Sequence, residues 1–473
     1  MKLLKNTLKL LLVLVLAYGL ARFVVVYHDS RLSGERAPYI QSLASTSVVI
    51  HWMTDSNQLG VVHYGIDAEH MAKVVLESSP TRNHIVTITG LKPATRYYYQ
   101  VGALSGFQPF DPEKNWFYTA PLEEVATRIW VIGDSGEAGD TLYQVRDAAF
   151  EWMQKNPPIR TETGPESEDS PAEQNSDQSD RNNDRPLINV WLALGDIAYR
   201  SGSNQQFQQA LFEPFADLLP NTAIWPVYGN HDDRRWTYFR IFDLPQYGEA
   251  GGVPSGTENY YAFDYSNIHF VVLDSQASDR DVDGDMLTWL QQDLAQNSKE
   301  WLIVAFHHPP YSKGSHNSDS ERDSRGRMRD MRENVLPVLE QAGVDLVLSG
   351  HSHMYERSYL IDCAYAPSTA FSDLNIVSRG VEKKNRQYIK PLDNRAHQGT
   401  VYIVAGSSAK VDQGELDHPA HTVGLMEAGS VVIDVLGNKL TARFINNRGE
   451  VRDEFSITKK PNYKSEYQGC QSG

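Results

Sequence analysis

The sequence predicts an α/β protein in which a small all-β sandwich precedes a larger domain of alternating strands and helices. Three observations carry this prediction. Short β-rich runs separated by turns fill residues 38–120. From Arg128 onward, apolar runs of strand length alternate with stretches of helical spacing, which is typical of an α/β core. Polar blocks rich in Gly, Asp, Asn and His follow the apolar runs of this second region.

Residues 1–27 are predicted to direct the chain to a membrane. Three lysines precede an apolar stretch over residues 10–20, and small residues near Ala21 suit a signal peptidase. The segment is therefore either a cleaved signal peptide or a retained N-terminal anchor. In an anchor, placing the charged side chain of Arg22 in the bilayer would cost up to ~3 kcal/mol of insertion free energy at the bilayer centre and less near the interface. Both alternatives predict export, with the folded part periplasmic, secreted or anchored on the outer side of the inner membrane.

The sandwich is predicted over residues 38–120. Its short strands alternate apolar and polar residues between turns. The segment 91–97 resembles the tyrosine corner of immunoglobulin-like and fibronectin-type sandwiches, which gives Tyr97 a structural role. The expected strands are Ser47–Trp52, Gly60–Tyr64, His84–Thr89 and Arg96–Val101.

The second domain is predicted over residues 125–459, followed by a tail at 460–473. Its first expected strands are Arg128–Ile132, Asn189–Leu194, Ile224–Tyr228, Tyr260–Phe263, His269–Leu273, Trp301–Phe306 and Val344–Leu348. Its expected helices are Asp140–Gln154, Gln205–Leu219, Met286–Gln296 and Met328–Ala342. Further β-rich runs follow from Val401 to about Ile457.

Residues 157–186 are predicted to be a disordered acidic insertion. They hold eight Asp or Glu and three Arg, a net charge of −5, and no aromatic residue. Such a segment buries too little apolar surface to offset the entropy of ordering. The whole chain carries a net charge of −16, which argues against nucleic acid as a structural partner because its binders present a basic face.

Cys363 and Cys470 are the only two cysteines. In an oxidising compartment they can form a disulfide, worth about 4 kcal/mol for so long a loop, although two unpaired thiols are the alternative. Neither lies in a Cys-x-x-Cys motif, which excludes zinc-finger and thioredoxin chemistry.

Five polar blocks together supply carboxylates, a phenol, an amide and imidazoles. This is the mixed oxygen and nitrogen ligand set of a paired metal centre. Each block stands at or just after the end of an apolar run, the edge where α/β sheets bind ligands. The blocks are Gly133–Gly136, Gly195–Tyr199, Gly229–Asp232, Val304–His307 and Gly350–His353.

Asp134 and Asp196 are expected at the ends of adjacent strands. Two such carboxylates would repel each other unless a cation lay between them, and Asp196 is the candidate to bridge two metals. Tyr199 follows three residues later and can reach the same ion. Because a phenol has a pKa near ~10, only a strongly Lewis-acidic ion holds it as phenolate, which favours ferric iron over zinc or magnesium.

Asn230 is a candidate neutral oxygen ligand. His231 is expected to face the substrate, with Asp232 or Asp233 orienting its ring. His307 ends another apolar strand.

His351 and His353 end the next strand, and their i, i+2 spacing directs both rings to one side of the backbone. His308 and His316, on the loop after the previous strand, are candidate substrate contacts.

These blocks, with the trailing 354–357 segment and the preceding fibronectin-like domain, resemble the purple acid phosphatases among the calcineurin-like metallophosphoesterases. The resemblance covers residues 38–459 and implies a four-layer α/β/β/α core with two mixed sheets and a dinuclear centre. It implies Fe(III) ligands, which are Asp134, Asp196, Tyr199 and His353. It also implies ligands for Zn, Mn or Fe(II), which are Asp196, Asn230, His307 and His351.

The same resemblance assigns His231 and His316 to the substrate side. Asn317 stands where relatives carry a second histidine, and His308 departs from the plant pattern. The residues expected to contact the substrate and its leaving group therefore differ from those of the plant relatives. The resemblance implies an acid phosphatase for small phosphorylated substrates, and the N-terminal segment predicts that it is exported.

The expected reaction is hydrolysis of phosphomonoesters by a metal-bound hydroxide that attacks phosphorus, with His231 as general acid. One alternative keeps the centre but acts on phosphodiesters or nucleotides. A remote alternative is a non-catalytic surface adhesion protein, which predicts at least one damaged ligand block, and none is damaged. The oligomeric state stays open.

Overall fold

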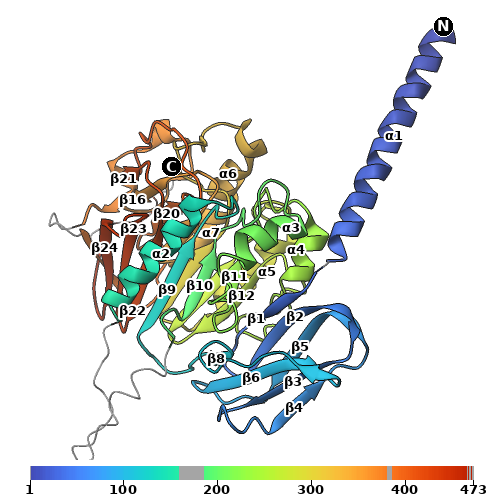
Figure 1. Ribbon diagram of the computed structural model, residues 1–473. Coiled ribbons are helices and arrows are strands. Elements are labelled where there is room, and N and C mark those ends of the chain that lie inside the picture. Colours follow the sequence, from blue (N-terminus) through green and yellow to red (C-terminus); the bar gives the residue numbers. More distant parts are fainter. Residues whose placement is uncertain are drawn as a thin grey trace, which may run out of the picture.

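The computed structural model describes residues 2–32, 34–158, 186–380, 386–465, 467 and 470 (Figure 1). A long N-terminal helix leads into a small β-sandwich, and a larger α/β domain follows. The insertion predicted to be disordered lies outside the described residues, apart from positions 157, 158 and 186 at its ends.

The N-terminal helix is α1 (Lys2–Ser30), and its apolar part is exposed along its length. It is long and apolar enough to cross a membrane, which fits a signal peptide or an anchor.

The sandwich has a three-stranded and a five-stranded sheet around its own core. Trp52 and Tyr99 are fully buried in that core. The hydroxyl of Tyr97 accepts a hydrogen bond from the backbone N–H of Lys92 at 3.0 Å, the contact that defines a tyrosine corner. The first sheet contains β1 (Arg36–Gln41), β2 (Ser47–Gln58) and β5 (Thr81–Thr89). The second contains β3 (Gly60–Gly65), β4 (Lys73–Leu76), β6 (Arg96–Ala103), β7 (Gly106–Phe107) and β8 (Trp116–Tyr118).

The larger domain is built on two stacked seven-stranded sheets, both with parallel and antiparallel pairs. In spatial order, the first sheet contains β11 (Ile224–Pro226), β10 (Val190–Ala193), β9 (Thr127–Ile132), β22 (Gly429–Leu436), β23 (Lys439–Asn446), β24 (Val451–Lys460) and β19 (Arg386–Pro391). The second contains β12 (Tyr261–Tyr265), β13 (Ile268–Val272), β14 (Trp301–Ala305), β15 (Leu346–Ser349), β20 (Val401–Ala405), β16 (Tyr355–Ser358) and β21 (His421–Leu425). A two-stranded sheet joins β17 (Leu360–Ile361) to β18 (Ile376–Ser378).

The alternation of side chains along the strands builds four layers. In β14, Ile303 belongs to the core between the two sheets, while Leu302 belongs to the core beneath the helices α5 (Asp285–Gln296) and α7 (Leu336–Gln341). On the far face of the first sheet, α2 (Asp140–Lys155) buries Val145 and Met153. The predicted four-layer α/β/β/α core with two mixed sheets is therefore confirmed, as is the fibronectin-like sandwich before it.

Three helical segments differ from the prediction. The expected helix at 205–219 is a short α3 (Asn204–Phe207) followed by one π-turn, Gln208–Phe212. The expected helix at 328–342 is divided into α6 (Arg327–Asp330), a π-turn and α7, because Pro337 lacks the N–H that a regular helix needs. The helix α4 (Arg235–Ile241) was not predicted, since seven residues are too few for a periodic signal.

Candidate metal centre

The carboxyl ends of strands from both sheets meet at one edge of the α/β domain. Asp134 follows β9, Asp196 follows β10 and Asn230 follows β11 in the first sheet. In the second sheet, His307 follows β14, and the loop with His351 and His353 follows β15. Ligand sites form at such edges because every parallel strand releases its loop there.

Four side chains form the first group of donor atoms. The hydroxyl of Tyr199 lies 3.2 Å from Oδ1 of Asp134, 3.1 Å from Oδ2 of Asp196 and 3.0 Å from Nε2 of His353. Nε2 of His353 also lies 3.5 Å from Oδ1 of Asp134. Two carboxylates, a phenol and an imidazole thus converge on one small volume, from segments far apart in the sequence.

A second group shares Asp196 with the first. Nε2 of His307 lies 3.0 Å from Oδ1 of Asn230 and 3.5 Å from Oδ2 of Asp196. Ligand atoms of Asp134, Asp196 and His307 all lie within 4.8 Å of one another. Ring nitrogens of His307, His308 and His351 are equally close together. The shared position of Asp196 suits a carboxylate that bridges two cations.

Each imidazole of the two groups is oriented by a second contact. Nδ1 of His353 lies 2.6 Å from a carboxylate oxygen of Asp412, and Nδ1 of His307 donates to the carbonyl of Leu194 at 2.7 Å. Both contacts direct Nε2 toward the centre, an arrangement that is common around protein-bound metals. In His351 it is Nε2 that contacts the hydroxyl of Ser324, at 2.6 Å, so Nδ1 is the nitrogen left for a metal.

Three of the candidate ligands have a strained backbone. The φ angles are +54° at Asp134, +52° at Asp196 and +68° at His351, in the left-handed region that residues other than glycine rarely adopt. The backbone N–H of His351 donates to Oδ2 of Asp134 at 2.7 Å, and that of His231 donates to Oδ1 of Asp196 at 2.7 Å. Such strain gathers at functional sites, where surrounding contacts hold it in place.

Two glycines let the ligand loops approach closely. A Cβ atom on Gly229 would lie 2.1 Å from the backbone nitrogen of Asp196, and one on Gly350 would lie 2.5 Å from Oδ2 of Asp134. Any other residue at these positions would push the carboxylates out of place.

The electrostatics of the site favour a bound cation. Burial alone would raise the pKa of Asp196, but the neighbouring imidazole of His307 lowers it. Burial would likewise lower the pKa of His307, yet the carboxylates of Asp196 and Asp134 raise it to about 9. Burial and the same two carboxylates raise the pKa of Tyr199 far above its usual value. Bound protons therefore offset the buried negative charge of these side chains. Metal cations that replaced those protons would offset the same charge, and the donor atoms are of the types that bind such cations.

A cavity of about 640 Å³ opens in front of the first group. Tyr199 and His353 form part of its wall, together with His231, Arg200 and Lys410. Its volume is in the range of small-molecule sites.

His231 is half-buried at this cavity. Its Nδ1 donates to the carbonyl of Arg200 at 2.9 Å, and its ring lies against that of Tyr199, with centroids 4.5 Å apart. The expectation that Asp232 orients His231 is wrong. The Asp232 carboxylate is buried and accepts hydrogen bonds from the backbone N–H groups of Ile197, Ala198 and Gly229. It holds two ligand loops together instead.

The other predicted substrate contacts lie around the second group. His316 is half-buried, stacks on His351 with centroids 3.9 Å apart, and contacts Asp323 through Nδ1 at 2.8 Å. His308 is buried and contacts the hydroxyl of Ser275, which gives it a packing role behind the site rather than the expected substrate contact. The amide oxygen of Asn317 accepts from the backbone N–H of Asp319, so this side chain serves its own loop.

Sequence reasoning missed several residues at the site. Asp412 and Lys410 lie in the polar loop after β20, an apolar run followed by polar residues like those of the five blocks. That pattern could have indicated them. Asp323 and Ser324 lie in an irregular loop whose sequence carries no comparable signal.

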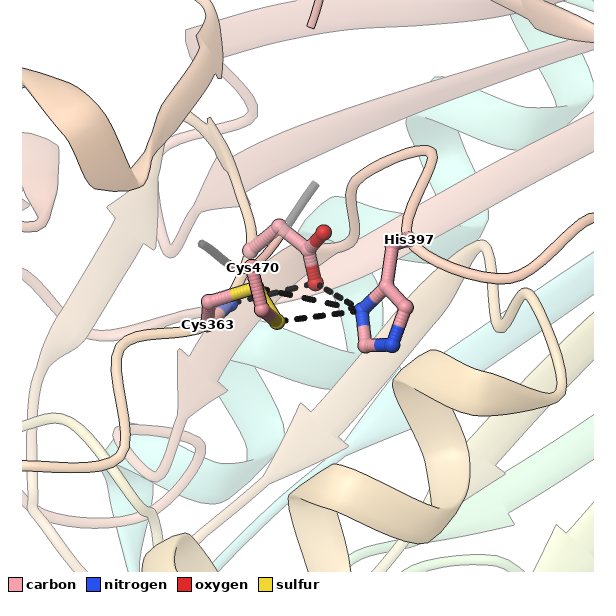
Figure 2. Close-up of side chains that lie close together, drawn as sticks. Cys363, His397 and Cys470 are labelled. Carbon is pink, nitrogen blue, oxygen red and sulfur yellow. Dashed lines mark hydrogen bonds and ion pairs between the residues drawn. A yellow bond between two sulfur atoms is a disulfide. The ribbon is translucent and has the colours of Figure 1, made fainter. Parts of the chain in front are cut away.

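Cys363 and Cys470 are joined by a disulfide (Figure 2). Nδ1 of His397 lies 3.4 Å from the Cys470 sulfur and 3.1 Å from a carboxylate oxygen of Asp362. The bond closes a loop of 107 residues and fixes Cys470 to the α/β domain.

Comparison with known proteins agrees with this architecture. A family model described as calcineurin-like phosphoesterase matches residues 127–355, and one described as the N-terminal domain of purple acid phosphatases matches residues 38–118. The fold and the site thus define a metallophosphoesterase domain behind a fibronectin-like sandwich.

Related sequences and a solved structure carry the same name. Purple acid phosphatase 15 of Arabidopsis thaliana is 24% identical over 81% of this chain and 63% of its own length. Purple acid phosphatase 23 of the same plant is 28% identical over 71% of this chain and 64% of its own length. The structure of purple acid phosphatase PPD1 from yellow lupin (Lupinus luteus) superimposes with a TM-score of 0.64 at 14% identity, over 93% of this chain and 77% of that one.

The chain belongs to the purple acid phosphatase family of calcineurin-like phosphoesterases. Membership implies a dinuclear metal centre. The chain spans slightly less than two thirds of the length of the two plant relatives.

Proposed function

We propose that the protein is an exported hydrolase of phosphomonoesters, with Fe(III) in one metal position and Zn, Mn or Fe(II) in the other. The observation that carries the proposal is the convergence of seven donor side chains on two adjoining groups that share Asp196. The Fe(III) position is the group with Tyr199, because a phenol with an ordinary pKa near ~10 is held as phenolate only by a strong Lewis acid.

The two cations, when bound, would supply Lewis acidity that neutralises phosphate charge and makes water acidic enough to attack near neutral pH. The seven donor side chains are the residues that would hold them, which are Asp134, Asp196, Tyr199, Asn230, His307, His351 and His353.

His231 is assigned to the leaving group. Since Nδ1 donates to the carbonyl of Arg200, the ring is fixed and Nε2 is free to hold a proton. From the cavity wall, this proton can pass to the oxygen of the departing alcohol. Proton donation of this kind accelerates a reaction roughly 10²–10⁴-fold. Arg200 and Lys410 also line this cavity, and their positive charges favour a phosphate dianion there. The Lys410 ammonium lies 3.0 Å from the Asp412 carboxylate.

The test is Asp196→Asn, which keeps the side-chain shape and removes the shared charge. Loss of both p-nitrophenyl phosphate turnover and bound metal supports the proposal, and survival of both contradicts it. Asp217→Asn is the matched control, since the Asp217 carboxylate is 85% exposed on the same domain. Turnover of a bis-ester faster than the mono-ester would favour a phosphodiesterase instead.

A further inference from the structure

The end of α1 that meets the folded part is fastened to the catalytic domain. Asp29 accepts hydrogen bonds from the backbone N–H of Asn204 at 3.1 Å and from the hydroxyl of Thr237 at 2.7 Å. It also forms an ion pair with Arg234 at 3.1 Å, in which both side chains are largely buried. Charged groups held at low exposure resist solvent screening, so these contacts fix the position of the helix.

The elements that hold α1 also line the active-site cavity. Asn204 begins α3, and Gln206 in the same helix forms part of the cavity wall. Arg234 precedes α4, and His231 stands three residues earlier in the same loop. Figure 1 shows α1 leaving the domain beside α3 and α4, while the sandwich extends in the other direction. A bilayer that contained α1 would therefore lie next to the cavity.

The span of α1 has the right length for this arrangement. Its apolar part, Asn6–Asp29, contains 24 residues, and none of the residues in its most apolar 18-residue window is buried in the protein. At 1.5 Å per residue it is ~36 Å long, enough for the ~30 Å hydrocarbon core of a bilayer. The lysines at its N-terminal end orient the catalytic domain to the outside.

A small apolar pocket of about 320 Å³ lies between α1 and α4. Phe23 packs edge-on against Trp236, with ring centroids 5.7 Å apart, and Val26 completes the apolar lining. Arg22, Asp233 and Arg235 line the same pocket, and Arg22 forms an exposed ion pair with Asp233 at 3.2 Å, which leaves Arg235 as the excess positive charge. Apolar walls beside a net positive charge match the chemistry of an anionic lipid.

We propose that the substrate is a phosphomonoester carried by a membrane lipid, with an acyl chain against Phe23, Val26 and Trp236 and its phosphate in the cavity of His231. The inference rests on the proposed phosphatase function and on α1 being a retained anchor. Phe23 and Val26 belong to the span itself, so the occupant of this pocket must reach bilayer depth. A lipid does so, and a soluble peptide or sugar does not.

The experiment uses the full chain in phosphatidylcholine vesicles that contain phosphatidic acid. Glycerol 3-phosphate is the soluble comparison, because it presents the same phosphate on the same kind of alcohol without acyl chains. We expect phosphatidic acid to be hydrolysed with a kcat/KM at least about tenfold higher, the effect of ~1.4 kcal/mol of extra binding. Trp236→Ala should lower the ratio of the two kcat/KM values about tenfold. Phe107→Ala on the sandwich is the matched control, since Phe107 is 44% and Trp236 48% exposed, and it should leave the ratio unchanged.

Equal turnover of the two substrates, or an equal loss on both in Trp236→Ala, would overturn the lipid inference while leaving the phosphatase function intact. Absence of turnover on either substrate would overturn both. Mass spectrometry of the purified chain is the second measurement. A mature N-terminus after Ala21 would remove Gly19 and most of the apolar span, and would overturn the inference as well.

Discussion

The ring of His353 contacts the carboxylate of Asp412 at 2.6 Å, across 59 residues of sequence. The pair links the loop after β15 to the loop after β20, which are adjacent strands of the second sheet. The carboxylate holds the ring so that Nε2 faces Tyr199 and Asp134. An outer carboxylate of this kind also makes the imidazole a better metal ligand.

Asp412→Asn is expected to weaken metal binding at the Tyr199 position by about 10–100-fold, because the neutral amide no longer supports the basicity of His353. The measurement is the iron content of the purified protein during titration with a chelator. Asp217→Asn serves again as the surface control. Unchanged retention of iron in Asp412→Asn would contradict the role given to this carboxylate.

His231→Ala should separate substrates by their leaving group. With an alkyl phosphate, whose departing oxygen needs a proton, we expect kcat to fall roughly 10²–10⁴-fold. With p-nitrophenyl phosphate the loss should be much smaller, because nitrophenolate leaves without help. His316→Ala, at the other metal group, is the comparison variant. Equal losses on both substrates in His231→Ala would show that the ring does not deliver the proton.

Removal of the Cys363–Cys470 disulfide should lower stability without lowering metal content. For a sequence separation of 107 residues, the chain-entropy model gives a loss of about 5 kcal/mol in the free energy of unfolding. The measurement is denaturant unfolding of a Cys363→Ser, Cys470→Ser double variant and of the parent protein. A midpoint that does not move would mean that the bond adds nothing to the folded state.

His269 provides a pH test away from the metal centre. Burial alone would lower the pKa of His269, but Asp264 at 2.7 Å and Asp293 at 2.8 Å raise it to about 9. Because the folded-state pKa is raised, this stabilisation is complete below the unfolded value of ~6.5 and is lost as pH rises through 9. His269→Gln should therefore cost on the order of 3 kcal/mol at pH 6 and much less at pH 10. Unfolding free energies at the two pH values measure this difference, and an equal cost at both would contradict the ion-paired state.

Much of the α/β core was predictable because strand burial leaves a local trace. Short, continuous apolar runs such as Trp301–Phe306 are typical of strands buried on both faces, and the polar residue that ends each run marks the ligand edge. The seven candidate ligands could therefore be proposed from the sequence, and the structure brings their side chains together.

Other features depend on contacts that no local pattern encodes. Asp232 looked like a partner of His231, but its carboxylate binds three backbone N–H groups from two loops. Ser324 reaches His351 only through the folding of an irregular loop. The contacts of Asp29 with Asn204 and Thr237 join residues more than 170 positions apart, so no local pattern indicates them.

The most direct test of the paired metal centre is the metal content of the purified full chain together with its visible absorption spectrum. We expect two metal ions per chain, at least one of them iron, and a phenolate-to-iron charge-transfer band that disappears in Tyr199→Phe. A colourless protein with both positions filled by zinc would contradict the ferric assignment. A protein with less than one bound metal per chain after loading would contradict the centre itself.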